Sequence, residues 1–161
     1  MAADIVIRAA RRRDAAAIWR LLRAMARYER LEAHFRTTPA AIARDLTGRR
    51  RRAECALAWR NRRAVGVIIW YATYSTFHPR AGVFVEDVFV SARLRHGGVG
   101  RALLAHVARR ALAAGGSYLS LEVLNWNPAM GFYRRLGFAA KTGWRSLGLA
   151  EAALQDLARS A

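Results

Sequence analysis

Hydrophobic residues recur along the chain with two spacings, and each spacing predicts one kind of element. From Ala15 to about Arg30, apolar residues occupy the i, i+3, i+4 and i+7 positions of one helix face, with Asp14 as the candidate N-cap. Thr38 and Pro39, followed by Gly48, predict a second and shorter helix. The remaining predicted helices lie at 99–114, 127–136 and 150–158.

Short runs of β-branched and aromatic residues, bounded by turn residues, predict strands. These runs are Ile5–Ile7, Cys55–Trp59, Val65–Thr73, Val83–Val90 and Tyr118–Val123. Two further segments predict short closing strands, Phe138–Lys141 and Trp144–Leu147. A three-strand meander followed by a strand–helix–strand crossover predicts an α/β fold, with a central mixed, mostly antiparallel sheet and helices on both faces.

Length and composition predict one domain over residues 1–161, since no repeat, low-complexity tract or linker interrupts the chain. The longest apolar run, Ala64–Ala72, is too short to span a bilayer, and the first residues lack the apolar region of a signal peptide. The single cysteine, Cys55, excludes an intrachain disulfide framework and fits a reducing compartment. We therefore expect a soluble, cytoplasmic domain with no membrane contact.

Charge changes this picture, because 28 basic residues face 11 acidic ones for a net charge of +17, and Lys141 is the one lysine. One interpretation is a polyanionic partner, such as nucleic acid or a cofactor that carries phosphates. The other is an arginine-rich composition set by nucleotide bias, which explains arginine over lysine but not the shortage of acids. Both stay open at this point. The four histidines and one cysteine show no metal-ligand spacing, so no metal is predicted.

A glycine-rich loop between a predicted strand and a predicted helix is the first candidate for chemistry. It reads Arg95-His96-Gly97-Gly98-Val99-Gly100. Glycines let the backbone approach a ligand closely, and a helix N-terminus offers free N–H groups and partial positive charge. The loop therefore predicts a phosphate or pyrophosphate site, although it matches neither the Walker nor the dinucleotide-binding pattern.

Two acids inside an apolar strand, Glu86 and Asp87, are the second candidate. Neighbouring residues on a regular strand point to opposite faces, so only one of them can face a given cleft unless a bulge re-aims them. The alternative is one satisfied acid and one acid exposed at an edge. The third candidate is the helix that carries Phe132 and Tyr133 and stops at Gly137, which is also compatible with simple amphipathic packing.

Taken together, these segments resemble the Gcn5-related N-acetyltransferase (GNAT) superfamily. The family's loop pattern, Gln/Arg-x-x-Gly-x-Gly/Ala, is matched by Arg95, Gly98 and Gly100. Its later pattern, Asn-x-x-Ala-x-x-Phe-Tyr-x-x-x-Gly-Phe, is matched by Ala129, Phe132, Tyr133, Gly137 and Phe138. Tyr28-Glu29, Tyr74-Ser75-Thr76-Phe77, Glu86–Val90, Val123–Asn127 and Gly143-Trp144-Arg145 are similar to the diamine branch, which includes spermidine/spermine N1-acetyltransferases and thialysine acetyltransferases.

The resemblance implies acetyl-CoA as the co-substrate and a role for each matched segment. Backbone groups of Val88, Phe89 and Val90 would line the pantetheine arm, and Asn127 would flank the cofactor. The residues implied at the pyrophosphate are Arg95, His96, Gly97, Gly98, Val99, Gly100 and Arg101. The family commonly has glycine where this chain has His96, which implies either a tighter loop or an unusual backbone angle at that residue. The residues implied to face the amine are Tyr28, Glu29, Glu86 and Asp87.

The implied chemistry is transfer of an acetyl group to a primary amine by direct attack on the thioester. An alkylammonium, with a pKa of about 10.4, must lose a proton before it attacks. Glu86 is the candidate base and also attracts the cation, whereas Tyr133 is the candidate acid that protonates the leaving thiolate. Four of the acids, Glu29, Glu32, Glu86 and Asp87, fall in the expected amine site.

The sequence thus predicts an acetyl-CoA-dependent N-acetyltransferase for a small cationic substrate, namely a diamine, a polyamine or a thialysine- or lysine-like amine. A protein or peptide N-acetyltransferase is the alternative on the same fold. A basic nucleic-acid-associated domain is the alternative from another class, although no helix-turn-helix, zinc or RNA-binding signature is present, and specific nucleic-acid binding is not expected. The resembled branch forms homodimers, and the aromatic segment Tyr74–Phe77 is compatible with one here.

Overall fold

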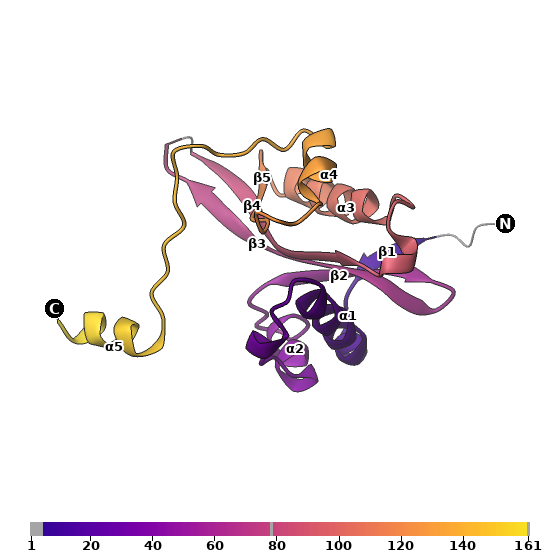
Figure 1. The fold of residues 1–161 in the computed structure, drawn as a ribbon, viewed down its shortest axis with the longest axis horizontal. Helices are drawn as coiled ribbons and strands as arrows, with labels where there is room; N and C mark the ends of the chain where they lie inside the picture. Colours follow the sequence, from indigo (N-terminus) through magenta and orange to yellow (C-terminus); the bar gives the residue numbers. More distant parts are fainter. Residues whose placement is uncertain (1–4, 78, 161) are drawn as a thin grey trace. The chain divides into compact units, whose positions relative to one another are not determined.

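The computed structural model describes residues 5–77 and 79–160 and is built on a five-stranded sheet. The strands lie side by side in chain order, the first four antiparallel and the last parallel to its neighbour (Figure 1). They are β1 (Val6–Ala9), β2 (Glu54–Arg60), β3 (Arg63–Ser75), β4 (Arg80–Val90) and β5 (Leu119–Leu121). The predicted mixed, mostly antiparallel sheet is therefore confirmed, with β5 shorter than its sequence pattern indicated.

Helices cover both faces of this sheet, as predicted. α1 (Ala15–Tyr28) and α2 (Pro39–Asp45) lie on one face, and α3 (Val99–Ala113) lies on the other (Figure 1). Thr38 caps α2 as expected, because its hydroxyl accepts a hydrogen bond from the Ala41 N–H at 3.1 Å. Single 3-10 turns occur at Arg12–Asp14, Glu32–His34 and Ala92–Leu94.

The hydrophobic core has two layers, one on each side of the sheet. Beneath α1, the fully buried side chains of Ile18 and Leu21 pack in one cluster with Leu57 and Val67. Toward α3, the fully buried residues are Ile68, Val85, Leu103 and Val107. Each layer removes large aliphatic side chains from water, at about 25 cal/mol per Å² of buried apolar surface.

Asp14 sits at the N-cap position of α1 but makes no capping hydrogen bond to that helix, contrary to the role its sequence position indicated. Its two carboxylate oxygens instead accept hydrogen bonds from the Arg8 guanidinium at 2.7 and 3.0 Å, and Oδ2 also accepts one from the Arg11 N–H at 2.7 Å. The side chain of Arg8 therefore ties β1 to the start of α1. These bonds, above all those from Arg8, hold the pKa of Asp14 below its usual range.

The chain divides into a large unit that ends at Asn127 and a small unit that begins at Pro128. The small unit holds α4 (Met130–Arg135) and α5 (Glu151–Arg159). The closing strands predicted at Phe138–Lys141 and Trp144–Leu147 are wrong, because no strand forms between α4 and α5. A strand needs a partner for its backbone groups, and sequence pattern alone does not supply one.

None of the helices formed by residues 5–77 and 79–160 combines the length and apolarity needed to cross a membrane.

Candidate active site

A β-bulge in β4 places the two acids of that strand. β4 pairs regularly with β3 up to Ile69 opposite Asp87, and the next pair is Trp70 opposite Val85, so Glu86 is the extra residue. An extra residue reverses the alternation of faces along the strand. Asp87 consequently points to the same side of the sheet as the α1 core, whereas Val85 lies in the layer toward α3. The structure therefore contains the bulge that the sequence analysis gave as the exception for Glu86 and Asp87.

Three predicted substrate residues are linked electrostatically at this bulge through Asp87. Burial, and after it the negative charges of Glu86 and Glu29, together raise the pKa of Asp87 to about 7. Burial also raises the pKa of Glu29, the residue that follows α1. A cation bound beside these acids would be attracted by their negative charge and would relieve the repulsion that Glu86 and Glu29 exert on Asp87.

Tyr71 and Glu122 belong to the same acidic surroundings, and sequence analysis did not identify either of them. Burial, and after it the charge of Glu86, raises the pKa of the Tyr71 hydroxyl, and Glu122 adds to this effect. Tyr71 also stacks on Phe84 with ring centroids 5.3 Å apart. Only the register between β3 and β4 relates Tyr71 to the acids, and a single sequence does not reveal that register.

The edge of β4 beyond the bulge is open on one side. β5 pairs with β4 only from Val83 to Val85, and in the described part of the chain no strand lies beside the continuation Val88–Val90. An unpaired strand edge presents N–H and C=O groups that an extended ligand can bind as another strand would. Val88, Phe89 and Val90, predicted to line an extended arm, therefore lie on this edge next to the acids, where the Val90 carbonyl accepts a hydrogen bond from Arg95.

The glycine-rich loop follows this open edge and leads into α3. Gly98, at the N-cap of α3, has φ +78°, and His96 has φ +67°, so the unusual angle expected at His96 is confirmed. The first helical hydrogen bond runs from the Ala102 N–H to the Gly98 carbonyl at 3.0 Å. The N–H groups of Val99, Gly100 and Arg101 in the first turn therefore have no intrahelical acceptor and suit an anion. Gly97 differs from them, because its N–H is bonded to the Leu94 carbonyl.

Arg95 connects this loop to the sheet and to α1. Its guanidinium lies 4.1 Å from the centre of the Tyr28 ring and 5.5 Å from that of Phe89, and its Nε donates to the Val90 carbonyl at 3.3 Å. Such a cation–π contact holds both side chains in place. Arg95 thus positions Tyr28 and also contributes positive charge near the loop.

Trp126 also contacts the Tyr28 ring, and sequence analysis assigned it no role. Its ring centre lies 6.1 Å from that of Tyr28, and the Arg30 guanidinium lies 5.5 Å from the Trp126 ring. Glu32, counted among the acids of this region, instead accepts hydrogen bonds from Arg27 and Arg23 at 2.8 and 3.2 Å. The negative charge of Glu32 is therefore paired with these two neighbouring arginines.

Two predicted residues stand near the boundary of the units. The Asn127 N–H donates to the Leu124 carbonyl at 2.8 Å, which forms a turn at the end of the large unit. Tyr133 lies on α4 in the small unit, buried and in ring contact with Phe132 at 5.3 Å and Phe138 at 5.7 Å. Among the described residues, no group of His, Cys, Asp and Glu side chains is arranged to hold a metal ion.

The large unit thus offers an acidic cluster, an open strand edge and a helix start with free N–H groups, in this order along β4 and the loop. A ligand with an extended amide-bearing arm and terminal phosphates fits the edge and the helix start. A cationic amine fits the acids. The chain thus supplies donors and acceptors suited to an extended, phosphate-bearing ligand and to a cation.

Comparison with known proteins agrees with this geometry. The family model described as "Acetyltransferase (GNAT) family" matches residues 9–138. Thialysine N-epsilon-acetyltransferase of Bos taurus is 32% identical over 168 residues, which cover 97% of this chain and 98% of that protein. L-ornithine N5-acetyltransferase of Arabidopsis thaliana is 32% identical over 93 residues, covering 57% of this chain and 41% of that protein.

Solved structures share the fold at lower identity. An integron cassette protein from the mobile metagenome of V. cholerae has a TM-score of 0.80 at 16% identity, covering 96% of this chain and 98% of the other. An aminoglycoside acetyltransferase from an uncultured soil metagenomic sample, in complex with sisomicin, has a TM-score of 0.75 at 13% identity, covering 91% and 96%.

Proposed function

Because the chain belongs to the acetyltransferase (GNAT) family and is an N-acetyltransferase, we propose that it moves the acetyl group of acetyl-CoA to a primary amine of a small cationic substrate. The observation that carries this proposal is the cluster of Glu29, Glu86 and Asp87 at the open edge of β4. In a chain with a net charge of +17, such a cluster marks a local site for a cation.

The substrate class follows from the acids together with the relatives. A substrate with two separated amines can place one ammonium against the carboxylates while the other end reacts. The relatives named for thialysine and ornithine acetylation act on amines of this kind. We therefore favour a diamine, a polyamine or a lysine-like amine.

Acetyl-CoA supplies an activated acetyl thioester when it is bound. Backbone groups of Val88, Phe89 and Val90 hold its extended arm by strand-like pairing. The first turn of α3, from Val99 to Arg101, holds its phosphates through free N–H groups. His96, Gly97 and Gly98 shape the loop, Arg95 and Arg101 add positive charge, and Asn127 flanks the cofactor.

The amine needs a proton acceptor before it can attack. Asp87, with a pKa of about 7, is poised between its two protonation states at neutral pH, which suits general-base catalysis. Glu86 on the bulge stays a candidate for the same role and attracts the ammonium. Tyr28 and Glu29 line the amine side, and Tyr133 protonates the departing thiolate.

Direct transfer is favoured over a covalent acetyl-enzyme. Cys55 is the one cysteine, it is buried, and burial followed by the charge of Asp87 raises the pKa of its thiol to about 12. A thiol of this kind is almost entirely protonated at neutral pH and is a poor nucleophile.

The experiment is release of thiol from acetyl-CoA against a panel of diamines, polyamines, lysine-like amines and peptides, with Tyr133→Phe beside the wild type. The proposal predicts release that depends on one class of small amine and decreases in Tyr133→Phe, while acetyl-CoA binding is kept. Acetylation of peptides alone would favour the protein-substrate alternative. Absence of acetyl-CoA binding would contradict the proposal.

We further propose that the protein forms a homodimer and works in the cytoplasm. Both units of each chain would form one acetyltransferase domain. Exposed apolar side chains support the dimer, in particular Trp144 (80% exposed), Leu147 (92%) and Phe77 (89%). A second copy would remove these from water. Sedimentation of Trp144→Ser/Leu147→Ser should give the mass of one chain, whereas Leu112→Ser, an exposed apolar residue on α3, should keep the mass of two. A wild-type monomer would contradict the dimer.

A further inference from the structure

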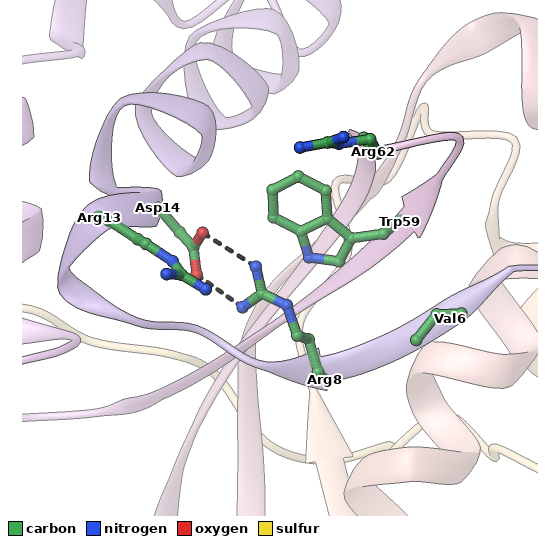
Figure 2. A pocket seen from close by; sticks show the side chains of 6 residues that line it. All are labelled: Val6, Arg8, Arg13, Asp14, Trp59 and Arg62. Carbon is green, nitrogen blue, oxygen red and sulfur yellow. Dashed lines mark hydrogen bonds and ion pairs between the residues drawn. The ribbon is translucent and has the colours of Figure 1, made fainter.

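A second pocket, with a volume of about 470 Å³, lies where β1, the start of α1 and the β2–β3 hairpin meet. Figure 2 shows its lining, and none of the lining residues belongs to the candidate active site. The lining consists of Val6, Arg8, Arg13, Asp14, Trp59 and Arg62. Its volume falls in the range typical of small-molecule sites.

Charge in this pocket is unbalanced. Three arginines and a single carboxylate line it. The carboxylate, that of Asp14, is 4% exposed and already accepts two hydrogen bonds from Arg8 and one from the Arg11 N–H. Arg13 and Arg62 are exposed and donate no hydrogen bond to any described residue. The pocket therefore keeps an excess of two positive charges.

Donors also outnumber acceptors there. Arg8 uses three of its five N–H groups, two on Asp14 and one on the Ala9 carbonyl at 3.1 Å. Its guanidinium lies 4.5 Å from the centre of the Trp59 ring, which it covers on one side. The buried Nε1 of Trp59 has no acceptor among the described residues. A ligand for this place must bring acceptor atoms and negative charge.

Arg62 occupies a position where glycine is the usual residue. Asn61 and Arg62 connect β2 to β3 with φ of +47° and +63°, the backbone of a type I′ turn. Glycine adopts such angles without strain, whereas a side chain makes them costly. Strain that is kept at one residue, with its charged side chain at the rim of a pocket, is typical of a functional position.

We propose that this pocket is a second ligand site, which binds the phosphoryl dianion of inorganic phosphate or of a phosphate monoester between Arg13, Arg62 and Arg8. The guanidinium groups of Arg13 and Arg62, which make no hydrogen bond to the described residues, match the charge of a dianion, and their planar forks match phosphate oxygens. A small ligand is favoured over nucleic acid because Arg8 already covers one side of the Trp59 ring, which closes that side to a stacked base.

The test follows the indole N–H signal of Trp59 by NMR, assigned with Trp59→Phe, while inorganic phosphate is added at pH 8. Ionic strength is kept constant with chloride, and the backbone signals of Gly98 and Gly100 are followed in the same spectra, so that binding at the glycine-rich loop is told apart from binding at this pocket. Adenosine monophosphate and dimethyl phosphate are titrated in parallel. Adenosine monophosphate tests whether an organic group attached to the phosphate increases affinity. Dimethyl phosphate is a monoanionic diester that resembles a nucleic-acid backbone.

The expected result is a saturable shift with phosphate that weakens about ten- to a hundredfold in Arg13→Ala and in Arg62→Gly. The matched variants Arg11→Ala and Arg12→Ala, exposed and outside the pocket, should bind as the wild type does. Equal affinity for adenosine monophosphate assigns the site to the phosphate group alone, and higher affinity assigns it to a monoester. The outcome does not depend on whether the chain acetylates amines.

Arg62→Gly separates binding from structure, because glycine relieves the turn. Its melting temperature should rise by about 2–4 °C while phosphate binding is lost. Three results would each overturn the proposal: no shift beyond that of chloride, full affinity in Arg62→Gly and Arg13→Ala, or dimethyl phosphate and oligonucleotides binding more tightly than phosphate. The last would indicate a nucleic-acid surface.

Discussion

The two units of the chain differ in where their apolar side chains lie. In the unit that ends at Asn127, residues of α1, α3 and the sheet are packed into two layers, and every buried apolar residue of the described chain except Tyr133 lies at or before Ala111. That unit also exposes large apolar side chains, Phe77 and Leu112 among them. In the unit that begins at Pro128, Trp144, Leu147 and Leu157 are exposed. The large unit thus combines a core with exposed apolar residues, whereas Tyr133 is the one buried residue among those described in the small unit.

The largest expected effect comes from the same substitution, leucine to alanine, made once in each unit. Leu57→Ala in β2 removes a fully buried side chain, and we expect it to lower the free energy of unfolding by about 2–5 kcal/mol. Leu147→Ala, at an exposed leucine, should change it by less than about 0.5 kcal/mol in the monomer. Urea denaturation at low protein concentration measures both variants. Equal decreases in the free energy of unfolding would contradict this difference between the units.

The two units also differ in their acidic residues. Burial raises the pKa of Asp87 in the large unit, whereas Glu151 and Asp156 in the small unit are exposed. A raised folded-state pKa at Asp87 means that its contribution is fully present below the unfolded value of 3.8 and is lost as pH rises through about 7. Asp87→Asn removes the group that ionises, so the variant does not lose this stability as pH rises. It should therefore be more stable than the wild type at pH 8, on the order of 2 kcal/mol, and not at pH 4.

Asp14→Asn is the control for that result, because the pKa of Asp14 is lowered and the sign is reversed. Its contribution is present above the unfolded pKa and lost as pH falls through the folded one. Asp14→Asn should therefore be less stable than the wild type at pH 8. Parallel pH dependence of stability in the wild type and Asp87→Asn would show that Asp87 is not held in a desolvated site.

A smaller effect is expected from one added methyl group. At Gly82 in β4 a Cβ would overlap the Tyr118 ring, whose hydroxyl shares a hydrogen bond with Thr73 at 3.2 Å. Gly82→Ala should cost about 1–3 kcal/mol through overpacking. At Gly148 a Cβ meets no neighbouring atom, so Gly148→Ala is the matched control with little effect. Thermal unfolding compares the two, and a tolerated Gly82→Ala would contradict the packing described.

Sequence pattern predicted the fold best where an element carries its own signals. The N-cap Thr38, the glycine stop after α3 and the positive φ of His96 are local features, and each was confirmed. The closing strands near Trp144 were wrong because strand formation depends on a partner outside the segment. Asp14 was assigned to a cap, but a guanidinium from β1 competes for the same carboxylate.

The candidate site was predictable in its residue types but not in its arrangement. Glu86 and Asp87 were identified as a pair, yet only the bulge opposite Ile69 and Trp70 places Asp87 on the α1 side with Glu29. Trp126 was missed because its contact with Tyr28 joins distant parts of the sequence. The roles of Tyr133 and the cofactor residues stay predictions.

The most direct measurement of the central claim is kcat/KM for a preferred diamine from pH 6 to 9 in the wild type, Glu86→Gln and Asp87→Asn. The account predicts a wild-type profile that rises through about pH 7 as Asp87 ionises and then levels. Asp87→Asn should lose this inflection and fall by about 10²–10⁴-fold. Glu86→Gln should weaken binding of the cation and keep an inflection, moved to lower pH because the charge that raises the pKa of Asp87 is gone. An Asp87→Asn variant with the wild-type profile would contradict the account.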